Sequence, residues 1–153
     1  MMTAPDPELL AQTLDGWLDG GCHHYPLKAQ YEDTDLSGIV FHGRYVAFAE
    51  RGRSAMLRCC GIDHYQMMSE NTAFAVRRMD VAFKAPSRQG EALTVRTSVE
   101  KVGGAVLHLR QQIVAADNSL RADVNVEVAV IHLEKGAMRL PSHLHDRIVA
   151  MMC

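Results

Sequence analysis

The sequence predicts an α+β fold in which an antiparallel sheet wraps around one long helix. Apolar residues recur at helical spacing between residues 45 and 59, whereas residues 93–99 and 124–130 alternate between apolar and polar as half-buried strands do. Short turn clusters such as Gly103-Gly104 separate the strands. Strands joined by such short turns pair as hairpins, so the sheet is expected to be antiparallel.

The length and composition limit the class of protein. A chain of 153 residues with 48% hydrophobic residues is large enough for one domain with its own core. Its net charge of −2 offers no basic face for nucleic acid. No apolar run reaches membrane-spanning length, and the start of the chain lacks the basic residues of a secretion signal. We therefore expect a soluble cytoplasmic protein with no nucleic-acid partner and no membrane insertion.

Residues 1–21 are predicted to form a helical extension ahead of a main domain at residues 22–153. Asp6 can cap this helix, Pro7 suits its first position, and Gly20 with Gly21 would end it. An apolar stripe on the helix needs a docking surface, so the extension is expected to cap a pocket or to extend an oligomer interface. The stripe consists of Leu10, Leu14, Trp17 and Leu18.

A strand at residues 24–31 is expected to deliver Asp33 and Asp35 to its end. Both aspartates lie in a polar break, and Gly38 can turn the chain there because a residue without Cβ accepts positive φ. The chain then enters the long helix, which Gly61 is expected to end. The buried stripe of this helix is Tyr45, Phe48, Ala49, Gly52, Met56 and Cys59.

The second half of the chain is expected to form the rest of the sheet. A strand begins near Thr72, changes its inward parity around Arg77 and Arg78 as at a bulge, and stops at Pro86. Three further strands and a closing helix follow. They are predicted at residues 93–99, 107–115, 124–130 and 141–151.

The region around the long helix resembles the signature of the 4-hydroxybenzoyl-CoA thioesterase-like branch of the hotdog superfamily, in particular the short-chain acyl-CoA thioesterases associated with the Tol-Pal system. The resemblance is specific for residues 31–53 and rests on strand order for the rest of residues 22–149. The matching positions are Tyr31, Asp33, Thr34, Asp35, Gly38, Val40, His42, Tyr45, Glu50, Arg51 and Arg53.

This resemblance implies a hotdog fold, a homodimer or homotetramer with active sites between the helices of two subunits, and hydrolysis of an acyl-CoA. An acyl-carrier-protein substrate is also open. Asp35 takes the position of the catalytic aspartate, as nucleophile or as general base, and the backbone N–H near His42 takes that of the carbonyl-polarising donor. A thiol with a pKa of about 8.5 leaves easily as thiolate, so one carboxylate can suffice.

Other residues near Asp35 have two interpretations each. Asp33 is expected to form hydrogen bonds in a turn, and the His42 side chain is either catalytic or a helix-start packing residue. Glu50 is either a second functional carboxylate or an ion-pair partner of Arg51 or Arg53. The expected catalytic residues are Asp35 and His42. The expected substrate-binding residues are Gly38, Val40, Phe41, Tyr45, Glu50 and Phe74.

Neither a metal nor a cofactor is expected. The cysteines Cys22, Cys59, Cys60 and Cys153 lack paired metal-ligand spacing, as do His143 and His145. Candidate CoA-phosphate partners are Lys84, Arg88, Lys101, Arg121, Lys135 and Arg139. Relatives often carry basic residues where this chain has Ala105 and Val106.

A second function stays open on the sequence. The same fold could serve as a non-catalytic acyl-binding or scaffold protein that works beside the cell-envelope machinery. The Asp35 motif and the helix entry favour the enzyme over this alternative. A hotdog hydratase is disfavoured, because it would need a differently spaced histidine and acidic residue.

Overall fold

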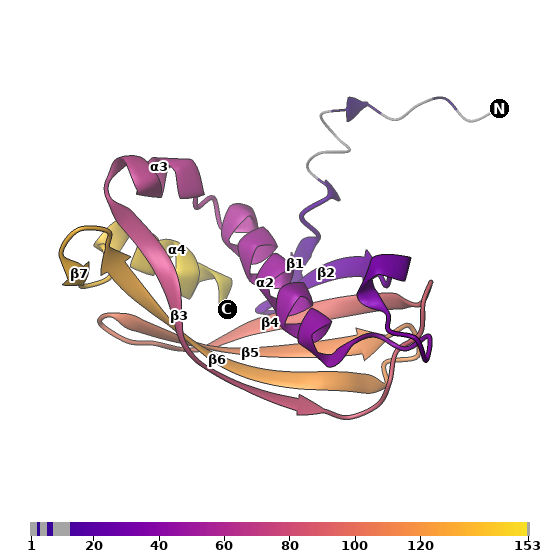
Figure 1. Cartoon of the computed structure of the whole chain (residues 1–153). Helices are drawn as coiled ribbons and strands as arrows, with labels where there is room; N and C mark the ends of the chain where they lie inside the picture. Colours follow the sequence, from indigo (N-terminus) through magenta and orange to yellow (C-terminus); the bar gives the residue numbers. More distant parts are fainter. Residues whose placement is uncertain (1–2, 4–5, 8–12, 153) are drawn as a thin grey trace.

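The computed structural model describes residues 3, 6, 7 and 13–152, and it has the predicted α+β architecture. One long helix, α2, lies across one face of a curved antiparallel sheet, and two shorter helices cover the end of that face (Figure 1). The elements are β1 (Trp17–Asp19), β2 (Cys22–Lys28), the 3₁₀ helix η1 (Tyr31–Asp33), α2 (His42–Cys59), α3 (His64–Ser69), β3 (Thr72–Phe83), β4 (Ala92–Val102), β5 (Val106–Ala115), β6 (Leu120–His132), β7 (Gly136–Ala137) and α4 (Ser142–Met151).

The sheet has seven strands, and its main path runs β1-β2-β4-β5-β6-β3, with β7 paired to β6. Every pairing is antiparallel, which confirms the prediction from the short turns. The predicted bulge is also confirmed, because the register of β3 on β6 shifts between Val76 and Arg78. The chain crosses the sheet through α2 and α3, so β3 becomes an edge strand bonded on one side only.

The core lies between α2 and the sheet. Phe48 and Ala49 are fully buried on the helix, opposite Val95 and Ile113 of the sheet. Gly52 permits a close approach here, because a Cβ at this position would lie 2.6 Å from Cγ1 of Val95. The apolar stripe of α2 predicted from the sequence therefore faces the sheet as expected.

The ends of α2 follow its sequence. Phe41 is the N-cap residue in extended conformation, and Cys60 is the C-cap. Gly61, at φ 76°, donates its N–H to the carbonyl of Arg58 at 2.9 Å. A left-handed residue at this position is the usual way to stop a helix, so the predicted end is confirmed. The closing helix is confirmed as α4.

The predicted N-terminal helix is wrong for residues 17–19, which form β1 on the edge of β2. Gly16, at φ 75°, breaks the helical path just before them. The Trp17 ring then stacks on His24 with centroids 5.5 Å apart, which favours the strand over an unpacked helical turn. Leu10 of the predicted stripe lies outside the described residues, and the division at residue 21 stays a prediction.

Asp15, in the segment before β1, bonds to both α2 and β2. Its carbonyl accepts a hydrogen bond from Nε2 of the fully buried His23 at 2.7 Å, and its carboxylate pairs with Arg58 at 2.8 Å. Burial lowers the pKa of His23, so the imidazole is neutral at physiological pH. Nδ1 of this histidine is buried without a partner among the described residues.

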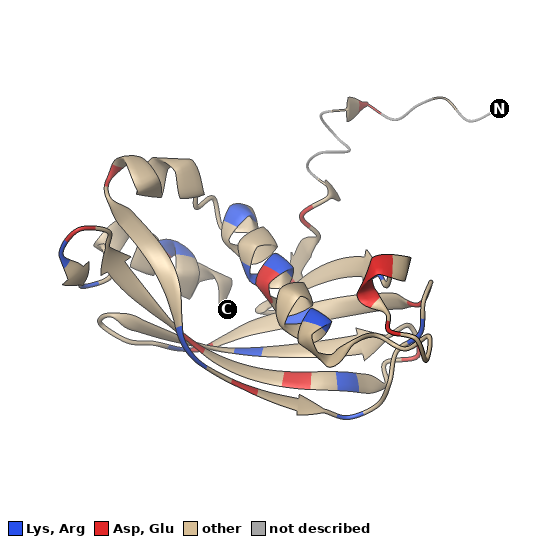
Figure 2. Ribbon diagram, viewed as in Figure 1, with Lys and Arg blue, Asp and Glu red and all other residues tan. Residues whose placement is uncertain are grey.

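The outer face of the sheet is charged (Figure 2). Arg110 pairs with Asp123 at 3.0 Å and Arg77 with Glu127 at 3.1 Å across neighbouring strands. One face is therefore packed on α2 and the other is polar, as is common for antiparallel sheets. Over the described residues, none of the helices combines the length and the apolar character needed to cross a bilayer.

Candidate functional site

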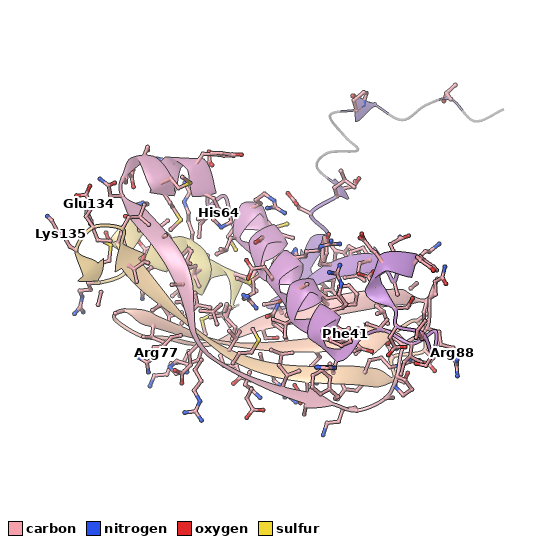
Figure 3. The ribbon with its side chains drawn as sticks, viewed as in Figure 1. Phe41, His64, Arg77, Arg88, Glu134 and Lys135 are labelled. Atoms are coloured by element: carbon pink, nitrogen blue, oxygen red, sulfur yellow. The ribbon has the colours of Figure 1, made fainter. Side chains whose placement is uncertain are left out.

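The loop between η1 and α2 holds Asp35 in a closed turn. The N–H of Asp35 donates to the carbonyl of Ile39 at 3.0 Å, and Gly38, at φ 77°, donates its N–H to the carbonyl of Asp35 at 3.1 Å. Ile39 also bridges to Arg88, whose labelled side chain marks this end of the molecule in Figure 3. Backbone bonds on both sides therefore fix the position of the aspartate.

The carboxylate of Asp35 is exposed and has one occupied oxygen. Oδ1 accepts hydrogen bonds from the N–H of Ser37 at 2.8 Å and from the Ser37 hydroxyl. These bonds, the hydroxyl first, lower the pKa of Asp35 below its usual range. Oδ2 has no partner among the described residues. The side chain is thus an ionised carboxylate with a free oxygen.

Asp33 is a structural residue. It is 2% exposed, and its Oδ1 pairs with Arg44 at 2.6 Å. Its Oδ2 accepts the N–H of Gln30 at 2.7 Å, and its carbonyl accepts the N–H of Phe41 at 2.9 Å. These bonds tie the loop to the first turn of α2, which confirms the interpretation of Asp33 as a hydrogen-bonding residue.

The N-terminus of α2 offers open backbone donors. The N–H of Arg44 bonds to the carbonyl of Phe41 at 2.9 Å, but those of His42 and Gly43 have no acceptor in the described part of the chain. Such orphan donors at the positive end of a helix dipole favour negative charge. The His42 ring contacts Phe41, with centroids 4.3 Å apart, and lies 6.0 Å from Phe83.

The predicted substrate-binding residues fall into two groups. Gly38 and Phe41 are exposed beside Asp35, whereas Val40 and Tyr45 are buried behind the loop. The hydroxyl of Tyr45 donates to Oγ of Ser87 at 3.0 Å, so this residue supports the loop from the core. The remaining two, Glu50 and Phe74, lie away from Asp35 and line a separate pocket.

This pocket of ≈ 330 Å³ lies between the C-terminal half of α2, α3 and β3. Phe41 and His64, labelled in Figure 3, lie at opposite ends of α2 and mark the two places. The pocket residues of α2 run from Glu50 to Leu57, so they begin about 12 Å along the helix from His42, at ~1.5 Å per residue. Within one chain, Asp35 and the pocket are therefore separated.

A buried polar network lies between α2 and the sheet, next to the pocket. Arg53 is 6% exposed, donates from Nη1 to Oε1 of Gln111 at 2.9 Å and pairs through Nη2 with Glu50. Gln111 in turn donates to the carbonyl of Ala49 at 2.9 Å and to Oγ1 of Thr97 at 3.0 Å. The expected pairing of Glu50 with an arginine is thus present, with Arg53. Gln111 was not predicted as a site residue, although a polar residue at an inward-facing strand position could have indicated a buried network.

The two cysteines at the end of α2 are poor nucleophiles. Burial raises the pKa of the Cys60 thiol to about 11 and also raises that of Cys59, so neither is a ready thiolate nucleophile. Residues 13–152, with residues 3, 6 and 7, contain no cluster of His, Cys, Asp and Glu that could hold a metal ion.

Comparison with known proteins places this site in a family context. The model of the thioesterase superfamily matches residues 37–122. The acyl-CoA thioester hydrolase YbgC of Escherichia coli O157:H7 is 39% identical over 126 residues, covering 82% of this chain and 92% of its own. The acyl-CoA thioesterase YbgC of Haemophilus influenzae is 31% identical, over 77% of this chain and 86% of its own.

A solved structure shows the same similarity. A probable thioesterase from Bartonella henselae superimposes with a TM-score of 0.75 at 34% identity, covering 78% of this chain and 99% of its own. The superposition includes nearly the whole of that protein.

Proposed function

Because the chain belongs to the thioesterase superfamily, we propose that it hydrolyses acyl-CoA thioesters with Asp35 as the reacting carboxylate. Thioester hydrolysis is its enzyme class, and the hotdog architecture is its fold. The observation that carries the catalytic assignment is the Asp35 carboxylate, ionised and free at Oδ2, in a loop that leads directly into the open N-terminus of α2.

The reaction needs a nucleophile or a base, donors that stabilise the oxyanion, and a thiolate that can leave. Asp35 attacks the thioester carbon, or it takes a proton from a water molecule that attacks instead. The carbonyl electrons move onto oxygen, and the N–H groups of His42 and Gly43 stabilise this oxyanion. When the carbonyl reforms, the C–S bond breaks and CoA leaves as a thiolate. In the nucleophilic route, water then hydrolyses the acyl-aspartate anhydride and restores Asp35. In the general-base route, Asp35 is restored when it passes its proton to the departing thiolate or to solvent.

We propose that the active unit is a homodimer formed through β3. This edge strand has one unbonded side, and an exposed edge is a template for pairing with another chain. Val76 and Phe83 on β3 are 47% and 52% exposed, and Phe41, whose ring contacts His42 near Phe83, is 48% exposed. A second copy would cover both the backbone edge and these apolar side chains. Two such dimers could assemble further into a tetramer.

This arrangement explains the separation between Asp35 and the pocket. His42 lies near Phe83 at one end of β3, while the pocket lies near Thr72 and Phe74 at the other end. If two copies of β3 pair antiparallel about the middle of the strand, the two ends meet. Asp35 of one subunit would then lie beside the pocket of its partner, and Glu50 and Phe74 would act as substrate-binding residues there.

Several finer points remain part of this proposal. The relatives support acyl-CoA as the substrate class, and an acyl-carrier protein is an alternative carrier. A cytoplasmic location is a prediction from charge and hydropathy, and association with the Tol-Pal system is a prediction from the resemblance. A scaffold without turnover is not favoured, because the relatives at 39% and 31% identity are named as thioester hydrolases or thioesterases.

The test is thiol release from acyl-CoAs by the wild type and by Asp35→Asn. We expect the variant to lose about 10²- to 10⁴-fold in kcat, because the amide can neither attack nor accept a proton. Asp19→Asn serves as a matched control, since Asp19 is an exposed carboxylate on β1 at the opposite edge of the sheet. Equal activity of Asp35→Asn and the wild type, at equal folding and mass, would reject the assignment.

A further inference from the structure

The pocket between α2, α3 and β3 has the size and lining of a site for an apolar chain. Its ≈ 330 Å³ falls within the range of about 300–1,000 Å³ that is typical of ligand sites. Apolar side chains from both layers surround it. They include Leu107, Leu109 and Val128 from the sheet, Met56 and Met67 from the helices, and Phe74 from β3.

Most of the strong polar groups around the pocket are already bonded. Arg53 donates to Gln111 and Glu50, and Oγ1 of Thr72 donates to the carbonyl of Glu70 at 3.2 Å. A polar ligand group would have to displace these bonds, which costs their energy without a clear gain. Ser54 and His64 also line the pocket and have no hydrogen bond among the described residues, so a hydroxylated aromatic ring is the competing ligand class.

The methionines favour a flexible ligand. Met56, Met67 and Met68 all line the pocket, and unbranched thioether side chains adapt their shape to what they contact. The volume equals about ten water-sized units of ~30 Å³, and a methylene group occupies roughly the same space. A single aromatic ring would leave much of this space empty.

We infer that this pocket binds an unbranched aliphatic acyl chain of medium length, about eight to ten carbons, and so sets the chain-length preference of the enzyme. The inference rests on the proposed thioesterase function and on the dimer, in which the partner's Asp35 lies at the mouth of the pocket. Glu50, paired with Arg53 and 62% exposed, stands at this mouth, where the chain would enter.

The kinetic test compares acyl-CoAs of increasing length with benzoyl-CoA and 4-hydroxybenzoyl-CoA. We expect kcat/KM to be highest for octanoyl- and decanoyl-CoA. Ser54→Leu, which places a larger side chain in the pocket, should lower kcat/KM for decanoyl-CoA by at least about 10-fold and leave butyryl-CoA within about 3-fold. Gln66→Leu is the control, because Gln66 is exposed on α3 and does not line the pocket.

A binding test separates this inference from the proposed activity. S-decyl-CoA and S-ethyl-CoA are thioethers that cannot be hydrolysed, so calorimetry reports their affinity whether or not the protein is an enzyme. Wild-type protein should bind S-decyl-CoA at least about 10-fold more tightly than S-ethyl-CoA, and Ser54→Leu should remove this difference. Equal affinities for the two thioethers, a Ser54→Leu profile identical to that of the wild type, or a preference for the hydroxylated ring would overturn the inference. Absence of thiol release with a retained S-decyl-CoA preference would reject only the enzymatic function.

Discussion

Ser37 orients the Asp35 carboxylate by donating twice to the same oxygen. Its N–H and its hydroxyl both reach Oδ1, while Oδ2 has no partner in the described chain. The two bonds stabilise the charged form and fix the orientation of the carboxylate, so the free oxygen points consistently in one direction. A residue two positions along the chain therefore does what a separate orienting side chain does in many hydrolases.

Removal of the Ser37 hydroxyl should shift the acid limb of the pH–rate profile. The pKa of Asp35 is lowered in the folded protein, so the wild type should lose kcat/KM only below about pH 3.9, the ordinary value for aspartate. Ser37→Ala removes the largest cause of this shift, so the limb should move to higher pH with little change near pH 7. Rates with butyryl-CoA between pH 3 and 8, beside circular dichroism at each pH, check this. An unmoved limb would show that Asp35 does not set the profile.

Gln111 has a comparable role at the middle of α2, where it bonds Ala49 and Arg53. The positive charge of Arg53 is buried, and burial lowers the pKa of its guanidinium. Among the described residues, one carboxylate, Glu50, pairs with Nη2 of Arg53, while Gln111 accepts a hydrogen bond from Nη1 and donates to the carbonyl of Ala49. A buried charge needs partners of this kind, since leaving it unpaired is strongly destabilising.

At the scale of elements, the contact between α2 and the sheet depends on Gly52. Replacing a helical glycine by alanine ordinarily stabilises a helix by about 1 kcal/mol. Here the new Cβ would lie 2.6 Å from Cγ1 of Val95, and overpacking of a core costs about 1–3 kcal/mol. We expect overpacking to dominate, so that Gly52→Ala lowers the free energy of unfolding by about 1 kcal/mol or more in urea titrations.

Val95→Ala provides the control for this prediction. It removes the γ-carbons that the alanine at position 52 would meet, at the cost of a cavity. The double variant should therefore lose less stability than the sum of the two single variants. Strict additivity of the three free energies would show that the close approach at Gly52 does not decide the cost.

The sequence predicted those elements whose local pattern and tertiary packing agree. The stripe of α2, its end at Gly61 and the bulge near Arg77 all follow from periodicity or backbone preference, and all are present. The segment around Trp17 also carries a helical stripe, but its packing on His24 favours a strand. The Asp35 loop was identified by its motif. Gln111 was not, although its polar side chain stands at an inward strand position, and the full pocket was not, because contacts between elements far apart in the sequence leave little trace in a single sequence.

At the scale of the whole molecule, the strand order is the basis of the proposed dimer. The crossover through α2 and α3 places β3 at the edge of the sheet, with the Asp35 loop at one end of it and the pocket at the other. β1 and β3 are the two edge strands of the main path, and both carry exposed apolar side chains, Trp17 and Leu18 on β1 and Val76 and Phe83 on β3. Of these two edges, β3 lies between the Asp35 loop and the pocket, so it is the edge through which we propose that a second copy pairs.

A charge in the middle of β3 should abolish both assembly and activity. Val76 is 47% exposed and lies at the bulge near the centre of the strand, so in a two-fold dimer it approaches its own copy. Val76→Glu would place two like charges together, and we expect light scattering to give half the mass of the wild type. Thiol release should fall by at least about 10²-fold although Asp35 is unchanged, because the pocket of the partner is lost. Leu18→Glu, on β1 at the opposite edge and 43% exposed, should leave mass and rate unchanged. A monomeric Val76→Glu variant with full activity would instead show that one chain contains a complete site.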